Sequence, residues 1–293
     1  MRVAVIAHKK KRLGEGLDAL RTALVDEGIT DPLWYEVSKS KKGPKKARKA
    51  KEAGADLFLV WGGDGTVQRC VDALAGSGAV IGILPAGTAN LLASSLDIPI
   101  DLRGALEVAL HGDRRKLDLG CMNGERFTVM AGAGFDALMM AEADRGLKDR
   151  FGRLAYLASG MKAMRAARFR ARIEVDGRLW YDGRVACTLV GNIGTIAGGL
   201  VVFEQARPDD GRLEVGVVSA DGVWDWLGVF SRLLRQQTSR SSLVRITSGH
   251  SIDIALHPST AYQLDGGDRK PTRHLRASVE PAAIEFCVPR STR

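Results

Sequence analysis

Two glycine-bearing turns carry residue types that can bind phosphate. The first is Gly62-Gly63-Asp64-Gly65-Thr66, which directly follows the apolar run Leu57–Trp61. Glycines let the backbone approach a ligand closely, and backbone N–H groups at the start of the next helix favour a phosphate there. Because the carboxylate of Asp64 would repel a bare phosphate, we expect it to hold Mg²⁺ or to fix the loop.

The second turn, Pro85–Asn90, follows the apolar run Val80–Leu84. Ligands of parallel sheets bind beyond the carboxyl ends of the strands, so we expect the two turns to line one site. One glycine-rich turn alone is often an ordinary strand-to-helix connection. Two such turns at the same edge favour a phosphate site over that simpler interpretation.

A late acidic turn, Leu264-Asp265-Gly266, can supply a different chemistry. A carboxylate within hydrogen-bond reach of an alcohol can orient the hydroxyl and accept its proton during phosphoryl transfer. An aspartate before a glycine is also an ordinary turn residue. From the residues alone, both roles of Asp265 stay open.

The composition is that of an ordinary globular protein. The chain has 293 residues, 45% of them hydrophobic and 26% charged, so two domains are expected. The first residues resemble a strand more than a signal peptide, and no apolar stretch is long enough to span a bilayer, so a cytoplasmic protein is predicted. The cysteines are far apart in the sequence, which indicates neither a disulfide framework nor a zinc site.

The net charge of +9 is concentrated in short basic runs. Eight lysines or arginines and no acid lie between Lys39 and Lys51, and further basic groups occupy Lys9–Arg12 and Arg145–Arg172. Such runs are often only solvated faces, but they also suit anionic lipid or polyphosphate. Aromatic residues make up 6% and do not interleave with the runs, so we expect no nucleic-acid partner.

Strand and helix patterns alternate through the first part of the chain. Helical spacing predicts helices over residues 13–27 and Val67–Ala75, and another after Asn90. The alternation predicts a doubly wound, mainly parallel α/β domain over residues 1–117. Its predicted strands are residues 2–7, Leu33–Val37, Leu57–Trp61 and Val80–Leu84.

The pattern changes after Leu117, where short strand-like runs are separated by turns. This spacing predicts a C-terminal β-sandwich domain over residues 118–293. Two helical segments occur within it, Leu154–Ala167 and the amphipathic Val223–Gln236. An amphipathic helix can lie on a membrane, but more often its apolar stripe packs on the protein's own core. The predicted strands are Phe127–Met130, Arg172–Val175, Val185–Val190, Leu213–Val218, Val244–Thr247, Ser251–Ala255, Ala277–Val279 and Ile284–Val288.

Five motifs occur in the order seen in the diacylglycerol kinase catalytic family, and the chain resembles the bacterial soluble lipid kinases of that family over almost its whole length. The first motif is shared with the NAD kinases, whereas the set in this order is specific. The resemblance implies an N-terminal nucleotide domain, a C-terminal β-sandwich and catalysis in a cleft between them. The motifs are Gly62–Thr66, Pro85–Asn90, Gly132–Ala137, Asp209–Leu213 and Leu264–Gly266.

The resemblance also implies a binding role for each matching residue. A hard cation prefers an all-oxygen shell, and the Mg²⁺ that family members bind away from the reaction centre would have one here. Its ligands would be the side chain of Asp210 and the backbone carbonyls of Arg207 and Arg212. The nucleotide site would consist of Gly62, Gly63, Asp64, Gly65 and Thr66 at the phosphates of ATP, with Thr88, Asn90 and Ser38 completing it.

Asp265 is our candidate for accepting the proton of the lipid hydroxyl, but the chain departs from the family pattern beside it. Family members usually have a second acid there, which is often treated as the proton acceptor. The second acid, expected two residues later, is replaced by Gly267, and Asp268 follows one position further on. Either Asp268 takes over, or Asp265 acts alone, or activity is weak. The Asn-Pro pair expected after the first strand is also absent, with Ala7-His8-Lys9 in its place.

These features predict an ATP- and Mg²⁺-dependent kinase that transfers the γ-phosphate to a lipid hydroxyl, with diacylglycerol as the first candidate. The expected setting is the inner face of the membrane, where a peripheral, cytoplasmic protein would meet its lipid on an anionic surface. Two alternatives stay open: an NAD kinase, and a non-catalytic lipid-binding regulatory protein gated by nucleotide. The oligomeric state is open as well, a homodimer included.

Overall fold

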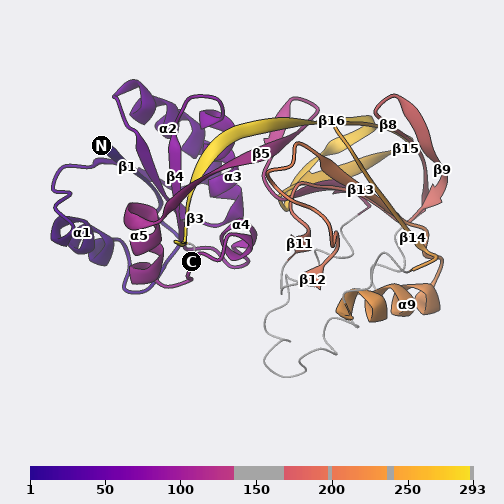
Figure 1. Cartoon of the computed structure of the whole chain (residues 1–293), viewed down its shortest axis with the longest axis horizontal. Helices are drawn as coiled ribbons and strands as arrows, with labels where there is room; N and C mark the ends of the chain where they lie inside the picture. The colour runs from indigo at the N-terminus through magenta and orange to yellow at the C-terminus, as the bar shows by residue number, and fades with distance from the viewer. Residues whose placement is uncertain (135–167, 197–199, 236–240, 291–293) are drawn as a thin grey trace. The chain divides into compact units, whose positions relative to one another are not determined.

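The computed structural model describes residues 1–134, 168–196, 200–235 and 241–290 (Figure 1). The chain forms two compact units, the first made of Met1–Leu119 with Glu280–Arg293 and the second of Gly120–Val279. The sequence pattern assigns residues 280–293 to the second domain. The structure assigns them to the first, because Glu285 and Phe286, near the end of strand β16 (Gly267–Val288), pair with strand β4 (Val80–Pro85).

The first unit is built on a parallel sheet. Its strands pair in the order β2-β1-β3-β4, and all run parallel. β1 and β3 are buried along their whole length, as parallel strands are when helices cover both faces of the sheet. The predicted doubly wound α/β domain is confirmed. The strands besides β4 are β1 (Val3–His8), β2 (Leu33–Val37) and β3 (Leu57–Gly62).

Helices alternate with these strands. Figure 1 shows α1 and α5 on one side of the sheet and α2 and α3 on the other, as right-handed crossovers require. Pro44 lies in the first turn of α2, where its missing N–H removes no intrahelical hydrogen bond. The helices are α1 (Leu17–Asp26), the single-turn η1 (Ser40–Lys42), α2 (Gly43–Glu52), α3 (Asp64–Leu74), α4 (Leu91–Ser95) and α5 (Leu102–His111).

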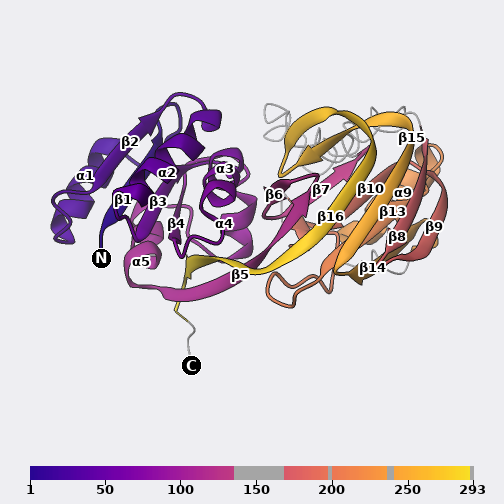
Figure 2. The ribbon, with the colours of Figure 1, turned by 90° about the horizontal axis from the view of Figure 1, so that it is seen from above.

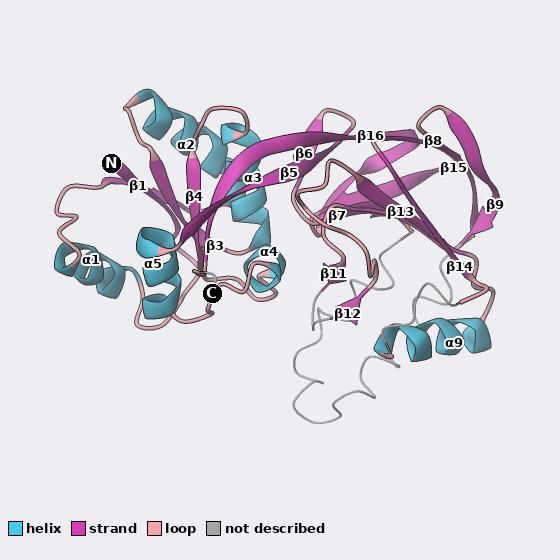
Figure 3. Cartoon of the chain, viewed as in Figure 1, coloured by secondary structure: helices cyan, strands magenta, loops and turns pink. Residues whose placement is uncertain are grey.

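The second unit consists mainly of antiparallel strands (Figure 3). One layer has the order β14-β13-β10-β7-β15, and the other pairs β9 with β8, β8 with β15 and β15 with β16. The strands are the last residues of β5 (Asp113–Met122), then β6 (Glu125–Phe127), β7 (Met130–Ala133), β8 (Phe169–Val175), β9 (Arg178–Val185), β10 (Cys187–Gly191), β11 (Thr195–Ile196), β12 (Leu200–Val201), β13 (Leu213–Val218), β14 (Val244–Gly249), β15 (Ser251–Leu264) and β16 as far as Val279.

Strand β15 belongs to both layers, whose strands are seen in Figure 2. Residues 252–257 pair with β8, whereas Tyr262–Leu264 pair with β7. Register shifts between Ala255 and Tyr262 mark the irregular part of the strand, as expected where a strand passes from one sheet to another. Buried side chains of both layers, Val215 and Ile254 among them, form one core. The predicted β-sandwich is confirmed.

Helix α9 (Val223–Leu234) packs its apolar stripe on the strands of this unit. Trp226 and Val229 are buried in a cluster with Val218 and Val244. Of the two roles open for this helix, packing on the protein's own core is the one that the structure shows, although Trp224 is 85% exposed. None of the helices among the described residues is long and apolar enough to cross a membrane.

Several predicted features lie outside the described residues. They are the helix Leu154–Ala167, residues 135–137 of one family motif, and residues 145–167 of one basic run.

Candidate active site

The two glycine turns of the first unit meet at the carboxyl edge of its sheet. Gly62 and Pro85 are partners in the register of β3 and β4, and the Ala86 N–H donates to the Gly62 carbonyl at 3.0 Å. The next glycines touch backbone to backbone, because a Cβ at Gly87 would lie only 2.4 Å from the Cα of Gly63. The two turns therefore form one continuous surface.

Asn90 shapes the second turn. It adopts the left-handed conformation with φ 49° and is buried. Its side-chain oxygen accepts from the Gly87 N–H at 2.9 Å, and its nitrogen donates to the carbonyls of Pro85 at 3.3 Å and Gly87 at 3.2 Å. Asn90 thus organises the turn that the expected nucleotide would meet, while Thr88 is exposed within it.

Helix α3 begins at Asp64, so the positive end of its dipole lies at the first glycine turn. The Gly63 carbonyl accepts from the N–H groups of Thr66 at 2.8 Å and Val67 at 3.1 Å, which closes the first helical turn. Gly65 is exposed, and a Cβ there would meet nothing within 4 Å. A helix start with an open, glycine-bearing backbone is the kind of surface that binds phosphate.

A hydroxyl from the segment after β2 joins this turn, and it belongs to Ser40 rather than to Ser38. The Oγ of Ser40 lies 2.9 Å from the Oγ1 of Thr66, which is buried, whereas Ser38 is exposed. Sequence reasoning missed Ser40 because η1 folds the chain back onto the turn, and no motif marks that fold-back. Nucleotide contact by Ser38 stays a prediction.

His8 is the last residue of β1, in the segment where the family pattern has an Asn-Pro pair. Its side chain is buried, and its Nδ1 accepts from the Lys10 N–H at 3.3 Å. Burial lowers the pKa of His8, and the nearby charges of Lys11 and Lys10 lower it further. His8 is therefore neutral at neutral pH. Lys9 pairs with Glu36 at 3.2 Å, so its charge is partly balanced.

The acidic turn of the second unit is a two-residue hairpin loop. Leu264 pairs with Gly267, and the residues between them, Asp265 with φ 44° and Gly266 with φ 76°, both adopt left-handed conformations. Two positive φ values in succession match the twist of a hairpin, and Asp-Gly is a favoured sequence for such a loop.

The carboxylate of Asp265 is buried and fully engaged. One oxygen accepts from the N–H and the hydroxyl of Thr128, both at 2.7 Å, and the other accepts from the N–H groups of Val129 and Met130, both at 2.9 Å. Burial raises the pKa of this carboxyl, and the four donors oppose the rise because they stabilise the charged form. Four donors occupy the four lone-pair sites of a carboxylate. Asp265 therefore holds the loop at residues 128–130.

Asp268 is exposed, in contrast to Asp265. It faces Gln263 across the hairpin, and its Oδ1 accepts from the Gln263 side-chain amide at 2.9 Å. Of the two acids expected to act on the acceptor hydroxyl, Asp268 is the one with an accessible carboxylate. The catalytic roles of both residues stay predictions.

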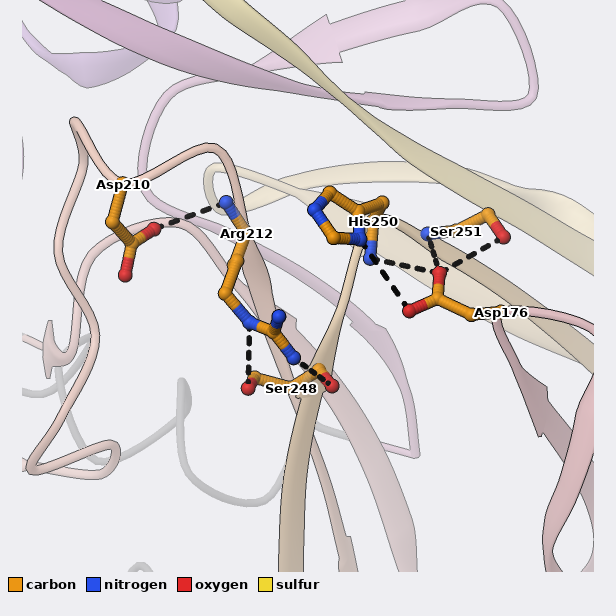
Figure 4. A network of polar contacts seen from close by, with 6 residues as sticks. All are labelled: Asp176, Asp210, Arg212, Ser248, His250 and Ser251. Carbon is orange, nitrogen blue, oxygen red and sulfur yellow. Dashed lines mark hydrogen bonds and ion pairs between the residues drawn. The ribbon is translucent and has the colours of Figure 1, made fainter.

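The expected Mg²⁺ ligand Asp210 lies in an exposed loop before β13. Its Oδ1 accepts from the Arg212 N–H at 3.0 Å, while the Arg212 guanidinium donates to the Oγ of Ser248 at 3.1 Å and to its carbonyl at 2.9 Å (Figure 4). The pKa of Glu214 is raised, first by burial and then by the negative charge of Asp210. Carboxylate and carbonyl oxygens are the donor type that a hard cation prefers, and the role of Asp210, Arg207 and Arg212 as Mg²⁺ ligands stays a prediction.

Comparison with known families shows which family the chain belongs to. Residues 3–122 match the diacylglycerol kinase catalytic domain, and residues 129–288 match the YegS C-terminal NAD kinase beta sandwich-like domain. The chain belongs to the diacylglycerol kinase catalytic family. Both glycine turns of this kinase lie in the first matched region, and its acidic turn lies in the second. The family makes the protein a phosphotransferase with an alcohol acceptor, as the resemblance implies.

Relatives of this kinase carry related names. It is 33% identical over 244 residues to the protein named "Probable lipid kinase YegS-like" of Pseudomonas aeruginosa strain UCBPP-PA14, covering 81% of this chain and 78% of that one. It is 29% identical over 228 residues to the protein named diacylglycerol kinase of Bacillus subtilis strain 168, covering 74% of each. A crystal structure described as a diacylglycerol kinase from Bacillus anthracis str. Sterne shares the fold, with a TM-score of 0.75 at 19% identity over 98% of this chain and 96% of that one.

Proposed function

We propose that this kinase transfers the γ-phosphate of ATP to the hydroxyl of a lipid, with diacylglycerol as the acceptor. The observation that carries the proposal is the backbone contact between Gly63 and Gly87, which joins two phosphate-type turns at the start of a helix. The names of the relatives support a lipid as the alcohol.

The first unit would bind the nucleotide. The backbone of Gly62–Gly65 would contact the phosphates of ATP, flanked by Thr66 and Thr88. Asp64, at the first position of α3, would hold the Mg²⁺ that accompanies ATP and neutralises charge on the phosphates. Phosphoryl transfer depends mainly on such positioning and charge stabilisation, so a rigid turn is the chain's own contribution.

The second unit would supply the group that acts on the acceptor. Asp268, with its exposed carboxylate, would orient the lipid hydroxyl and accept its proton. Asp265 would act indirectly by holding the loop at residues 128–130. A second Mg²⁺ on Asp210 and the carbonyls of Arg207 and Arg212 would stabilise the loop before β13.

The contact between the two glycine turns can be tested by Gly87→Ala. The added Cβ would lie 2.4 Å from the Cα of Gly63 and 2.5 Å from the Oδ1 of Asn90, so the turns must separate. We expect affinity for a non-hydrolysable ATP analogue to fall about tenfold, from an overpacking cost of about 1–3 kcal/mol. Calorimetry measures this, with Gly228→Ala as control because a Cβ there meets nothing within 4 Å. Equal affinity in both variants would contradict the proposed nucleotide site.

An anionic membrane surface is the proposed meeting place with the lipid. The basic run is partly folded into η1 and α2, whose Ala47 and Ala50 are buried while Lys41, Lys45 and Arg48 are exposed. A basic residue near an anionic membrane contributes about 1 kcal/mol, and this contribution is screened by salt.

We expect the wild-type protein to sediment with vesicles that contain anionic lipid and to detach at high salt. Changing Lys41, Lys45 and Arg48 together to glutamine should weaken binding about 100-fold at low salt, from about 1 kcal/mol per residue. The control removes the same charge from the second unit by changing Arg178, Arg184 and Arg273, all exposed, to glutamine. Equal losses in both variants would show that only net charge matters.

A lipid-panel assay tests the proposed function itself. Labelled ATP is offered with diacylglycerol, other lipid alcohols or NAD, and we expect label in the diacylglycerol fraction. Folded protein with Mg²⁺ that labels none of the lipids would refute the proposal. Label in NADP would identify an NAD kinase, and nucleotide binding by calorimetry without any turnover would identify a regulatory protein.

A further inference from the structure

A largely buried ion pair lies beside the acidic hairpin. The Nε of Arg269 donates to one carboxylate oxygen of Glu125 at 2.7 Å, and its Nη2 donates to the other. The side chains are 15% and 32% exposed, respectively, and Glu125 raises the pKa of Arg269. The guanidinium is therefore fixed in one plane by both oxygens of its partner.

The remaining terminal nitrogen of this guanidinium reaches the hairpin backbone. Nη1 of Arg269 donates to the carbonyl of Gly267 at 2.8 Å and to the carbonyl of Asp268 at 3.0 Å. These carbonyls lie immediately before and after the Cα of Asp268. The guanidinium thus fixes the backbone that carries the exposed carboxylate.

The glycine at position 267 is explained by the same guanidinium. A Cβ at Gly267 would lie 2.9 Å from the Nη1 of Arg269, in space that the pinned side chain already occupies. The backbone of Gly267 is outside the left-handed region, so its conformation does not itself require glycine. A longer side chain at this position would compete with Arg269 for its place.

A contribution to folding stability does not by itself explain why an ion pair occupies this place. The cost of desolvating two charges offsets most of their attraction, so a buried ion pair adds little net stability compared with apolar residues. What an arginine offers beyond charge is a rigid fork of donors, which lysine lacks. Here the fork connects Glu125 of β6 to the backbone around Asp268.

We propose that Glu125 and Arg269 are positioning residues that hold the Asp268 carboxylate in place for the acceptor hydroxyl. The inference rests on the proposed kinase function, in which Asp268 receives the proton. Neither residue touches the reacting atoms, and both act through the backbone of the hairpin.

Arg269→Lys tests the inference because it keeps the charge and removes the fork. We expect kcat for lipid phosphorylation to fall about tenfold, since small misplacements of a reacting group are costly, while the KM for ATP stays unchanged. The matched control is Arg170→Lys, which disrupts an exposed fork on Asp182 with contacts of 2.9 and 3.1 Å. Kinetics that are the same for both variants would overturn the inference.

Exchanging the two charges distinguishes the positioning role of the ion pair from its contribution to folding stability. In the double variant Glu125→Arg with Arg269→Glu, an ion pair can form again, but a carboxylate at position 269 cannot donate to the two carbonyls. We expect the melting temperature to recover relative to Glu125→Arg alone, and kcat to stay low. Recovery of kcat together with stability would show that the pair is only structural.

Amide hydrogen exchange gives a result that does not depend on catalysis. In peptides covering residues 262–270, exchange should be faster in Arg269→Lys and in Gly267→Ala than in the wild type or in Arg170→Lys. Unchanged exchange would overturn the positioning role. If exchange is faster but the wild type phosphorylates no lipid, the proposed function fails, and the inference that Asp268 is held for an acceptor fails with it.

Discussion

Asp265→Asn will lower the free energy of unfolding by about 2–4 kcal/mol, although the two side chains have nearly the same shape. Each carboxylate oxygen accepts two hydrogen bonds from residues 128–130. If the amide nitrogen replaces the oxygen at Val129 and Met130, its N–H groups face two backbone N–H donors in a buried place. If it replaces the other oxygen, it faces the Thr128 N–H, and the Thr128 hydroxyl must turn round to accept. Urea unfolding followed by fluorescence measures the loss.

A second hairpin in the same unit provides the matched control. Asp176, with φ 49°, and Gly177, with φ 75°, form the loop between β8 and β9. The Oδ1 of Asp176 accepts from the N–H groups of His250 at 2.9 Å and Ser251 at 2.8 Å (Figure 4). The hydrogen bond from the Ser251 N–H is the main cause that lowers the pKa of Asp176, whose side chain is 42% exposed.

Asp176→Asn should cost less than about 1 kcal/mol, because water can satisfy the groups that the variant leaves unpaired. The two hairpins share their sequence pair and differ in burial. If Asp265→Asn is no more destabilising than Asp176→Asn, the buried network around Asp265 does not have the strength inferred here.

This comparison also decides how activity data on the acidic turn are interpreted. Loss of activity in Asp265→Asn will accompany loss of stability, so it is no sign of direct chemistry by Asp265. Asp268→Asn changes an exposed group and should reduce turnover with little change in stability.

Asp64→Ala will reduce kcat/KM for lipid phosphorylation by about 100-fold or more, because a carboxylate that holds Mg²⁺ at the phosphates stabilises charge in the transition state. The fold should survive, because the Gly63 carbonyl still accepts from the N–H groups of Thr66 and Val67 and so closes the first turn of α3. Radiolabel transfer to diacylglycerol vesicles and a urea titration measure the two quantities on the same preparation.

The control for Asp64 is Asp101→Ala at the start of α5. Asp101 is the N-cap, and its Oδ1 accepts from the Gly104 N–H at 2.8 Å. Its loss should cost about 1 kcal/mol of stability and leave turnover unchanged. Retained turnover in Asp64→Ala would remove this acid from the proposed site.

The parallel sheet could be predicted mainly because its strands β3 and β4 are apolar. Leu57–Trp61 and Val80–Leu84 are buried between helices, so each appears in the sequence as an uninterrupted apolar run bounded by glycine or proline. The glycine turns follow from the same pattern, since the ends of adjacent parallel strands must meet at one edge. Strand β9 was not predicted because much of Arg178–Val185 is exposed and mixes polar with apolar residues.

The chemistry of the acidic turn could not be predicted from local sequence. Asp-Gly indicates a hairpin, but the burial of Asp265 depends on Thr128, far earlier in the chain. The sequence pattern predicts two separate strands, Ala277–Val279 and Ile284–Val288, in this part of β16. The structure continues it through Ala282, which has φ 49° and donates its N–H to the Oδ1 of Asp118 at 2.7 Å.

Because residues 280–293 belong to the first unit, that unit is completed only when the end of the chain has been synthesised. Ile284, Phe286 and Cys287 are buried there. A ribosome that has released only residues 1–119 has therefore produced a first unit in which β4 pairs with β3 but still lacks β16. That unit must wait through the synthesis of the whole intervening unit, and an expression fragment of it needs the late strand supplied through a linker or as a separate peptide.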